Sequence, residues 1–178
     1  MRHEAIARNY AEVLFDLGEQ HGESERYGAL LEALAAAVTG TPQVLAVMMS
    51  PRVPKGVKAE LLADALPDAP EPFVLFLRAL VKRGRQGVLD EVAQVYTSLV
   101  DAKLNRVRVG VTLAHEADGA LRQQIAASLT KALGKEALVR YASDPAILGG
   151  SVVRVGDRVH DGSLRRKMIM LRRQLLNR

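Results

Sequence analysis

The amino-acid sequence predicts an α+β protein, with a six-helix bundle over residues 1–105 and a small α+β domain over residues 106–178. Two observations predict this division. In the first part, apolar residues recur at the three- and four-residue spacing of amphipathic helices. In residues 106–113, RVRVGVTL, they fall on every second position, as in a half-buried strand. This change of period places the domain boundary near Asn105.

The first helix is expected over residues 3–21, and it carries two neighbouring stripes. Larger apolar residues form one stripe: Ile6, Tyr10, Val13, Leu14 and Leu17. Ala7 and Ala11 form a second stripe of small residues. That stripe permits either close packing within the bundle or a shallow groove for a partner helix. Further helices are expected at about residues 23–38, 42–49, 54–66, 72–82 and 86–104, with Gly and Pro between them.

The fifth helix, PFVLFLRALVK, is apolar on nearly all sides, because Arg78 is its only polar residue between Phe73 and Val81. A helix of this kind is covered either by its own domain or by another protein. We expect four large side chains to face the core: Phe73, Phe76, Leu77 and Leu80. Leu75 and Ala79 are then left near a partner surface. Gly84 is expected to end the helix, and Arg85 to cap it or form an ion pair.

In the second part, the pattern predicts a helix over about residues 117–133, ended by Gly134, and a strand over residues 137–142. The residues of this helix expected to face inward are Leu121, Ile125, Leu129 and Leu133. Gly156-Asp157 is then expected to close a β-hairpin, and Ser163 to cap a final helix over residues 164–176. This gives one short sheet and two helices. The turn-forming residues of the segment are Asp144, Pro145, Gly149, Gly150, Gly156, Asp157, Asp161, Gly162 and Ser163.

Charge divides between the same two parts. Residues 1–105 carry 11 Lys and Arg against 14 Asp and Glu, a formal charge of −3, whereas residues 106–178 carry 14 against 6, a charge of +8. The final helix places Leu164, Met168, Leu171 and Leu175 on one side and only basic charges elsewhere. Two surfaces of different charge favour two different partners.

No set of residues suggests catalysis or a cofactor. The chain has no cysteine, which excludes disulfides and thiolate metal sites. Its four histidines are far apart and form no HxxxH or HExxH pair, so no metal is expected. No P-loop is present, and no apolar run approaches the ~20 residues that span a bilayer. We therefore expect neither an enzyme nor a protein inserted in a membrane, and a bacterial cytoplasmic location is the simplest inference.

The segment from Asp144 to Arg165 resembles a known family. Its pattern, DP-x-I-x-GG-x-VVRVGD-x-V-x-DGS-x-R, is similar to the C-terminal signature of the delta subunit of F-type ATP synthase, called the oligomycin-sensitivity-conferring protein in mitochondria. Tyr10-Ala11 and Gly84-Arg85 also match motifs of this family. Arg83 and Gln86 depart from it, since they stand where the family usually has Asn and Leu.

The resemblance implies a non-catalytic stator subunit, present once per complex, that links the catalytic alpha/beta head to the peripheral stalk of b subunits and supports coupling of proton flow to ATP synthesis. It implies a peripheral position at the cytoplasmic face of the bacterial plasma membrane. It assigns the helical domain to the N-terminal helices of alpha, in a groove between the first and fifth helices. Our candidates for that groove are Ala7, Tyr10, Ala11, Leu14, Leu75 and Ala79. The basic domain is then expected to bind b, with Arg165, Arg166 and Arg172 as candidates from their charge.

Two other classes of function stay open at this point. The basic second part has the charge for an RNA-binding module, although it lacks interleaved aromatic residues and no nucleic acid is expected. The helical first part also fits a generic adaptor unconnected with energy conversion. Binding to RNA, or failure to bind alpha-subunit peptides, distinguishes these classes from a stator subunit.

Overall fold

A computed structural model describes the backbone of residues 2–176 and the side chains of residues 4–176. The mixed α+β class is confirmed. The chain forms two compact units, which divide between Val100 and Asp101. This division lies slightly before the boundary predicted near Asn105. The Asp101 carboxylate accepts a 2.7 Å hydrogen bond from Nε of Arg108, so this end of α6 contacts the second unit.

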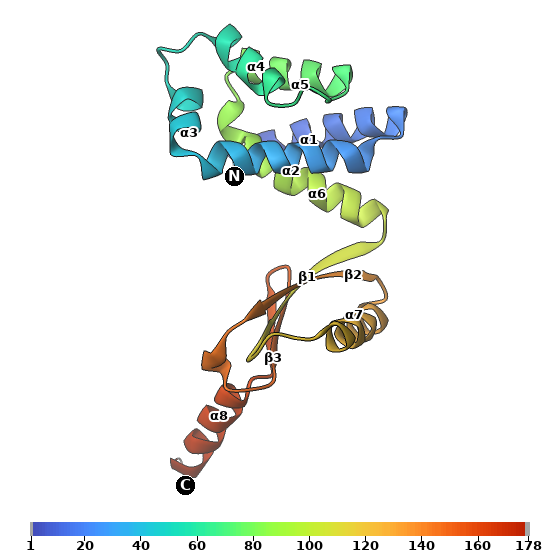
Figure 1. Ribbon diagram of the computed structural model, residues 1–178, viewed down its shortest axis with the longest axis vertical. Helices are drawn as coiled ribbons and strands as arrows, with labels where there is room; N and C mark the ends of the chain where they lie inside the picture. The colour runs from blue at the N-terminus through green and yellow to red at the C-terminus, as the bar shows by residue number, and fades with distance from the viewer. Residues whose placement is uncertain (1, 177–178) are drawn as a thin grey trace. The chain divides into compact units, whose positions relative to one another are not determined.

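The first unit is helical (Figure 1). Its elements are α1 (Arg2–His21), α2 (Ser24–Gly40), α3 (Pro42–Met49), α4 (Lys55–Asp64), α5 (Glu71–Lys82), the 3-10 helix η1 (Gln86–Val88) and most of α6 (Leu89–Lys103). The last helix was expected from about Gln86; residues 86–88 form a 3-10 helix instead, and the α-helix begins at Leu89. Gly87 disfavours an α-helix there, and the side-chain amide of Gln86 instead donates a 3.1 Å hydrogen bond to the Met48 carbonyl.

Glycine ends α5 as predicted. Gly84 has a φ of +67°, in the left-handed region. The N–H of Gly84 donates to the Val81 carbonyl at 2.8 Å, and the N–H of Arg85 donates to the Leu80 carbonyl at 3.0 Å. This pair of hydrogen bonds is a Schellman motif, which satisfies carbonyls that have no partner within the helix. Arg85 therefore caps α5 through its backbone, and its side chain stays exposed.

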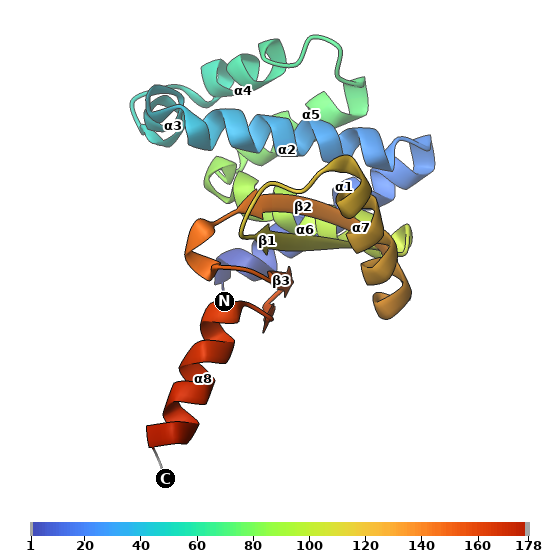
Figure 2. The same cartoon turned by 60° about the horizontal axis from the view of Figure 1, so that its bottom comes forward.

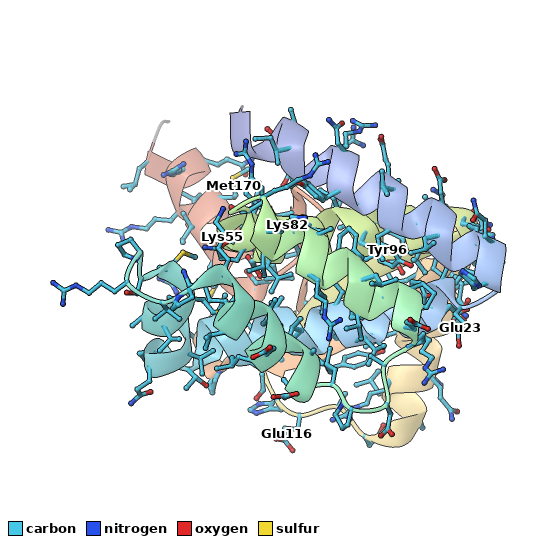
Figure 3. All side chains as sticks on the ribbon, turned by 90° about the horizontal axis from the view of Figure 1, so that it is seen from above. Glu23, Lys55, Lys82, Tyr96, Glu116 and Met170 are labelled. Atoms are coloured by element: carbon cyan, nitrogen blue, oxygen red, sulfur yellow. The ribbon has the colours of Figure 1, made fainter. Side chains whose placement is uncertain are left out.

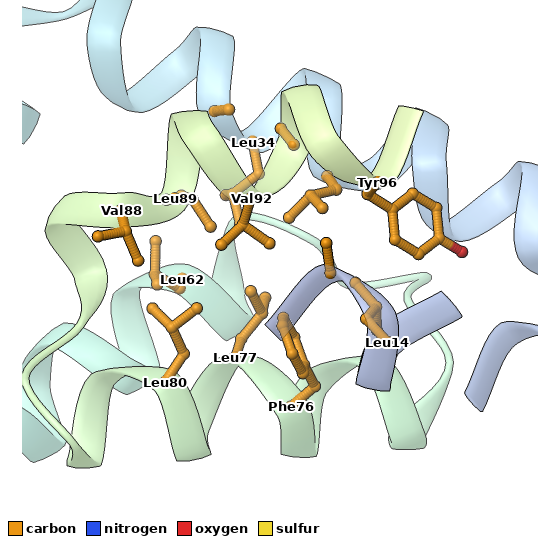
Figure 4. Close-up of a cluster of buried hydrophobic side chains, with 14 of the residues drawn as sticks. Leu14, Leu34, Leu62, Phe76, Leu77, Leu80, Val88, Leu89, Val92 and Tyr96 are labelled. Carbon is orange, nitrogen blue, oxygen red and sulfur yellow. The ribbon is translucent and has the colours of Figure 1, made fainter. Parts of the chain in front are cut away.

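The core of the first unit is built from large, fully buried side chains, among them Tyr27 and Phe73. Leu77, Val92 and Tyr96 belong to the same core (Figure 4). The four residues of α5 that were expected to face the core do so. The Tyr96 hydroxyl donates a 2.9 Å hydrogen bond to the Ser24 carbonyl. Burial raises the pKa of Tyr96 and of Tyr27 above the ordinary tyrosine value.

Two lysines of α4 hold the ends of other helices. Lys55 Nζ donates to the Lys82 carbonyl at the end of α5, at 2.9 Å (Figure 3). The buried Lys58 Nζ donates to the Ser50 carbonyl that follows α3, at 2.7 Å. Positive charge at a helix C-terminus offsets the helix dipole. These contacts fix α3, α4 and α5 to one another.

The second unit contains a four-stranded sheet with the order β2-β1-β3-β4. Its elements after α6 are β1 (Arg106–Leu113), α7 (Gly119–Leu133), β2 (Glu136–Ser143), the 3-10 helix η2 (Pro145–Ile147), β3 (Ser151–Val155), β4 (Arg158–Asp161) and α8 (Leu164–Leu176). β1 pairs with β2 in parallel, connected through α7, and the remaining pairs are antiparallel. The predicted strands, hairpin and final helix are thus confirmed.

The core of this unit is small. Val109, Val111 and Ala137 form its buried cluster, and α7 covers them from one face of the sheet (Figure 2). Ile125 and Leu129 of α7 pack against this cluster. Leu121 and Leu133 were also expected to face inward, but they are 43% and 37% exposed. The prediction fails at both ends of α7, because only the middle turns of the helix lie over the buried strand residues.

Candidate docking surfaces

A groove lies between α1 and α5, which run antiparallel. Phe73 of α5 packs against Tyr27, with ring centroids 5.5 Å apart, and Tyr27 lies beside Gly18 in the second half of α1. One turn later, Phe76 packs edge-to-face against Tyr10, with ring centroids 6.1 Å apart. α5 therefore runs from the C-terminal half of α1 toward its N-terminal end.

The groove has a volume of about 750 Å³. Most of its lining is apolar, and it is formed by Ile6, Asn9, Tyr10, Val13, Phe76, Ala79, Arg83 and Arg85. Val13 is 62% exposed although it is a large aliphatic residue. An open apolar groove of this size between two helices is suited to the apolar face of a third helix.

Four of the six residues predicted for the groove do not line it. Ala7, Ala11 and Leu14 are fully buried in the core of the first unit, so their assignment to a partner surface is wrong. The physical reason is that small residues allow helices of the same unit to approach α1 closely. The alternative interpretation of the alanine stripe, close packing within the bundle, is the one that the structure bears out.

The larger residues beside that stripe form the wall of the groove instead. Tyr10 and Ala79 lie in the lining, as expected. Leu75 is 54% exposed on α5 but is not part of the lining. Sequence reasoning missed Ile6, Asn9, Val13, Phe76, Arg83 and Arg85. A signal was present for Val13, which lies three residues after Tyr10 and therefore on the same face of the helix.

The turn residues of the second unit form hydrogen bonds and turns of the local backbone. Oδ1 of Asp144 accepts a 2.9 Å hydrogen bond from the Ala146 N–H, and Pro145 opens η2. Of the two residues that join β3 to β4, only Gly156 has a positive φ, as in a type II′ turn, and Asp157 completes it. These four residues therefore shape turns of the second unit itself.

The start of α8 is held by a small polar network. Oγ of Ser163 accepts a 3.2 Å hydrogen bond from the Arg166 N–H, which caps the helix. The Asp161 carboxylate accepts a hydrogen bond from the Ser163 N–H at 2.9 Å. The pKa of Asp161 is lowered below its ordinary value, most strongly by a hydrogen bond from the Ser163 side chain and then by the one from the Ser163 backbone.

Two glycines allow close backbone approach beside this network. Gly150 has a φ of +78°, and a Cβ added to it would lie 2.5 Å from the Gly162 carbonyl oxygen. A Cβ on Gly162 would meet the Ser151 oxygen at 3.2 Å. Leu164 also lies against Gly149, where an added Cβ would be 2.8 Å from Cδ1 of Leu164. These positions bring the β3 entry, the end of β4 and the start of α8 together.

α8 extends away from the sheet of the second unit (Figures 1 and 2), and its main contact there is with η2. All of its large apolar side chains are between 46% and 75% exposed. The candidate basic residues Arg165, Arg166 and Arg172 are exposed as well. Arg166 lies 4.0 Å from the Asp161 carboxylate, whereas no side-chain partner of Arg165 or Arg172 is recorded among residues 4–176.

Within residues 4–176, no three His, Cys, Asp or Glu side chains gather as metal ligands do. In the described part of the chain, no single helix is long and apolar enough to cross a bilayer. Taken together, α2 and α3 have the necessary length and composition, but they are bent by 96° relative to each other.

Known proteins were compared with the chain. A family model described as the ATP synthase delta (OSCP) subunit matches residues 6–175. The ATP synthase subunit delta of Gemmatimonas aurantiaca is 43% identical over 173 residues, which cover 97% of this chain and 94% of that protein. That of Anaeromyxobacter sp. (strain Fw109-5) is 40% identical over 175 residues, covering 96% and 97%.

Similarity of fold extends to a solved structure. A chain in the cryo-EM structure of the Toxoplasma gondii mitochondrial ATP synthase hexamer aligns with a TM-score of 0.70 and 20% sequence identity. The alignment covers 96% of this chain and 97% of that one. The match therefore includes both units of the fold.

Proposed function

The chain belongs to the ATP synthase delta (OSCP) family, and on this premise we propose that it is a non-catalytic stator subunit of an F-type ATP synthase. It links the catalytic alpha/beta head to the peripheral stalk of b subunits, one copy per complex. This link keeps the head stationary, so that rotation of the central stalk, driven by proton flow, acts on the catalytic sites. The subunit then lies peripherally, at the cytoplasmic face of the bacterial plasma membrane.

The helical first unit binds the head in this proposal. Its six helices form one bundle. An N-terminal helix of alpha binds this bundle in the groove between α1 and α5. The observation that supports this assignment is the open apolar lining, with Tyr10, Val13, Phe76 and Ala79 placed to contact the apolar face of a helix. Leu75, exposed on α5, extends the contact along one edge.

A charge placed in the groove tests this half of the proposal. Val13→Asp replaces an exposed apolar side chain by a carboxylate. The fold should be retained, because Val13 is not part of the core, while the docked helix loses an apolar contact. Affinity for a synthetic peptide of the alpha N-terminus is expected to fall by about tenfold or more. Val57→Asp, on a residue of α4 that is 48% exposed and outside the groove, is the matched control.

Calorimetric titration of the full chain with the peptide gives the answer. Weakened binding by Val13→Asp and unchanged binding by Val57→Asp support the groove. Equal affinities for wild type and both variants would remove the peptide from this groove. Tyr10→Asp is a second variant, expected to act in the same direction because Tyr10 lines the groove.

The basic second unit binds the b stalk in this proposal, with Arg165, Arg166 and Arg172 of α8 as contacts. Its formal charge of +8 from residue 106 onward supports an acidic partner. Attraction between exposed charges is screened as ionic strength rises. Affinity for the soluble part of b should therefore fall between low salt and about 0.5 M salt, and an affinity independent of salt would refute the electrostatic contribution.

A further inference from the structure

We propose that α8 binds its partner as a two-stranded coiled coil, and that the partner helix carries acidic residues beside its apolar seam. This inference rests on the proposed binding of the b stalk for the name of the partner. The other parts of the proposal rest on the pattern of residues on α8. This pattern gives the contact residues, the charges beside them and the reasons against other binding partners.

The apolar side chains of α8 follow a heptad. Leu164, Met168, Leu171 and Leu175 are separated by four, three and four residues, the alternation of d and a positions in a coiled coil. They are 48%, 55%, 57% and 75% exposed, so this seam is open along its length. Ile169 and Met170, although also apolar and exposed, fall outside the seam, at the b and c positions.

Packing within the second unit does not cover the seam. α8 is attached at its first turn, where the Leu164 N–H donates a 2.9 Å hydrogen bond to the Gly149 carbonyl and Ser163 caps the helix. From there the helix extends away from the sheet (Figure 1). A short helix gains most of its stability from tertiary contact of its apolar face, and the seam of this 13-residue helix is largely without such contact. Such contact is available to a partner helix over about two heptads.

Charge selects the partner. Arg165 and Arg172 occupy the e positions, Lys167 occupies a g position, and α8 contains no Asp or Glu. A second copy of α8 in parallel pairing would place Lys167 against Arg172 of the other helix, and like charges there oppose pairing. A helix with Glu or Asp at the flanking positions is favoured instead. Anionic lipid is a weaker candidate because α8 has no Trp, Tyr or Phe to insert at the interface.

Two matched pairs of variants in the full chain test the inference. Leu171→Asp and Met170→Asp change adjacent residues of similar exposure, 57% and 49%, by the same chemistry, but only Leu171 lies in the seam. Arg172→Glu and Arg173→Glu change the net charge equally, but only Arg172 flanks the seam. The probe is the soluble part of the b subunit encoded in the same genome, titrated at constant salt.

We expect Leu171→Asp to weaken binding by about tenfold or more, and Met170→Asp by less than about twofold. We expect Arg172→Glu to weaken it by about threefold to fivefold, with Arg173→Glu again below about twofold. Equal effects within both pairs would overturn the coiled-coil register while leaving b as the partner. Absence of binding by the wild-type chain would overturn the inference together with the proposed function of the second unit.

Two control measurements address the other occupants. Sedimentation of the free chain is expected to give a monomer, and a dimer abolished by Leu171→Asp would overturn the hetero-pairing. Flotation with vesicles containing anionic phosphatidylglycerol is expected to leave the chain unbound. Binding to these vesicles that Arg172→Glu and Arg173→Glu weaken equally, without binding to b, would assign α8 to a membrane surface instead.

Discussion

The two units differ in how much of their apolar surface they bury. The first has a core that includes fully buried Tyr27, Phe73, Leu77 and Tyr96, whereas the buried cluster of the second consists of Val109, Val111 and Ala137. In the first unit a helix exposes few large apolar residues, for example Val13 of α1 and Leu75 of α5. In the second, a whole helix is left uncovered. In the proposed function, this difference makes the first unit a self-supporting receptor for a helix, whereas the second unit completes its packing with a partner.

The largest effect is expected from a core substitution that destabilises the first unit but not the second. Leu77→Ala removes a fully buried side chain from the first unit and should lower its free energy of unfolding by roughly 2–5 kcal/mol. The second unit has its own core, so its unfolding should hardly change. Scanning calorimetry should show two transitions in the wild type and a shift of only one of them in the variant. A single transition that moves as a whole would contradict the comparison.

A smaller effect is expected from the backbone of the second unit. Gly150→Ala combines a φ of +78° with a Cβ 2.5 Å from the Gly162 oxygen, and should destabilise the unit by about 2–4 kcal/mol. Gly162→Ala should be milder, because its nearest contact is at 3.2 Å and its φ is not positive. Gly119→Ala is the control, since nothing lies within 4 Å of the added Cβ. Thermal melting in which Gly150→Ala matches Gly119→Ala would disprove this account of the turn.

Alkaline pH should act on the first unit through its buried tyrosines. Burial raises the pKa of Tyr27 and Tyr96 in the folded state. Their contribution to stability is therefore full below the ordinary tyrosine pKa of about 10 and is lost as pH rises toward the folded value. Tyr27→Phe should reduce this loss, and at neutral pH it should be tolerated, because the buried Tyr27 hydroxyl has no hydrogen-bond partner among residues 4–176. Denaturant unfolding between pH 8 and pH 11 measures the slope; an unchanged slope in the variant would refute the assignment.

Acid pH should have the smallest effect, in the second unit. The lowered pKa of Asp161 means that its contribution to stability is present above the ordinary carboxyl pKa and is lost as pH falls through the folded value. Asp161→Asn should therefore weaken the unit at pH 7 but make it less sensitive between about pH 4 and pH 2. Equal acid sensitivity in wild type and variant, followed by circular dichroism, would exclude this role.

The sequence predicts the second unit better than the first. Strict alternation in RVRVGVTL and the Gly156-Asp157 turn are local signals, and each led to a strand or hairpin at the right residues. Ser163 likewise marks the start of α8, because capping depends on neighbouring residues in the chain.

The groove was only partly predictable, because it depends on which face of α1 meets the other helices. Ala7 and Ala11 are compatible with either a groove or a close helix contact, and the spacing of residues does not distinguish them. The distance between packed helices decides, and here it places the small stripe inside and Tyr10 and Val13 outside. The exposure of α8 could not be predicted either. The same heptad spacing of apolar residues occurs in a helix that packs within its own domain and in one that binds a partner.

The central claim is that one chain holds the head and the stalk at the same time. In the most direct test, the soluble part of b is immobilised and the purified alpha/beta head is added with or without this subunit. The head should be retained only when the subunit is present. Val13→Asp should release the head but leave the subunit on b, and Leu171→Asp should release both from b. Equal retention of the head without the subunit would contradict the claim.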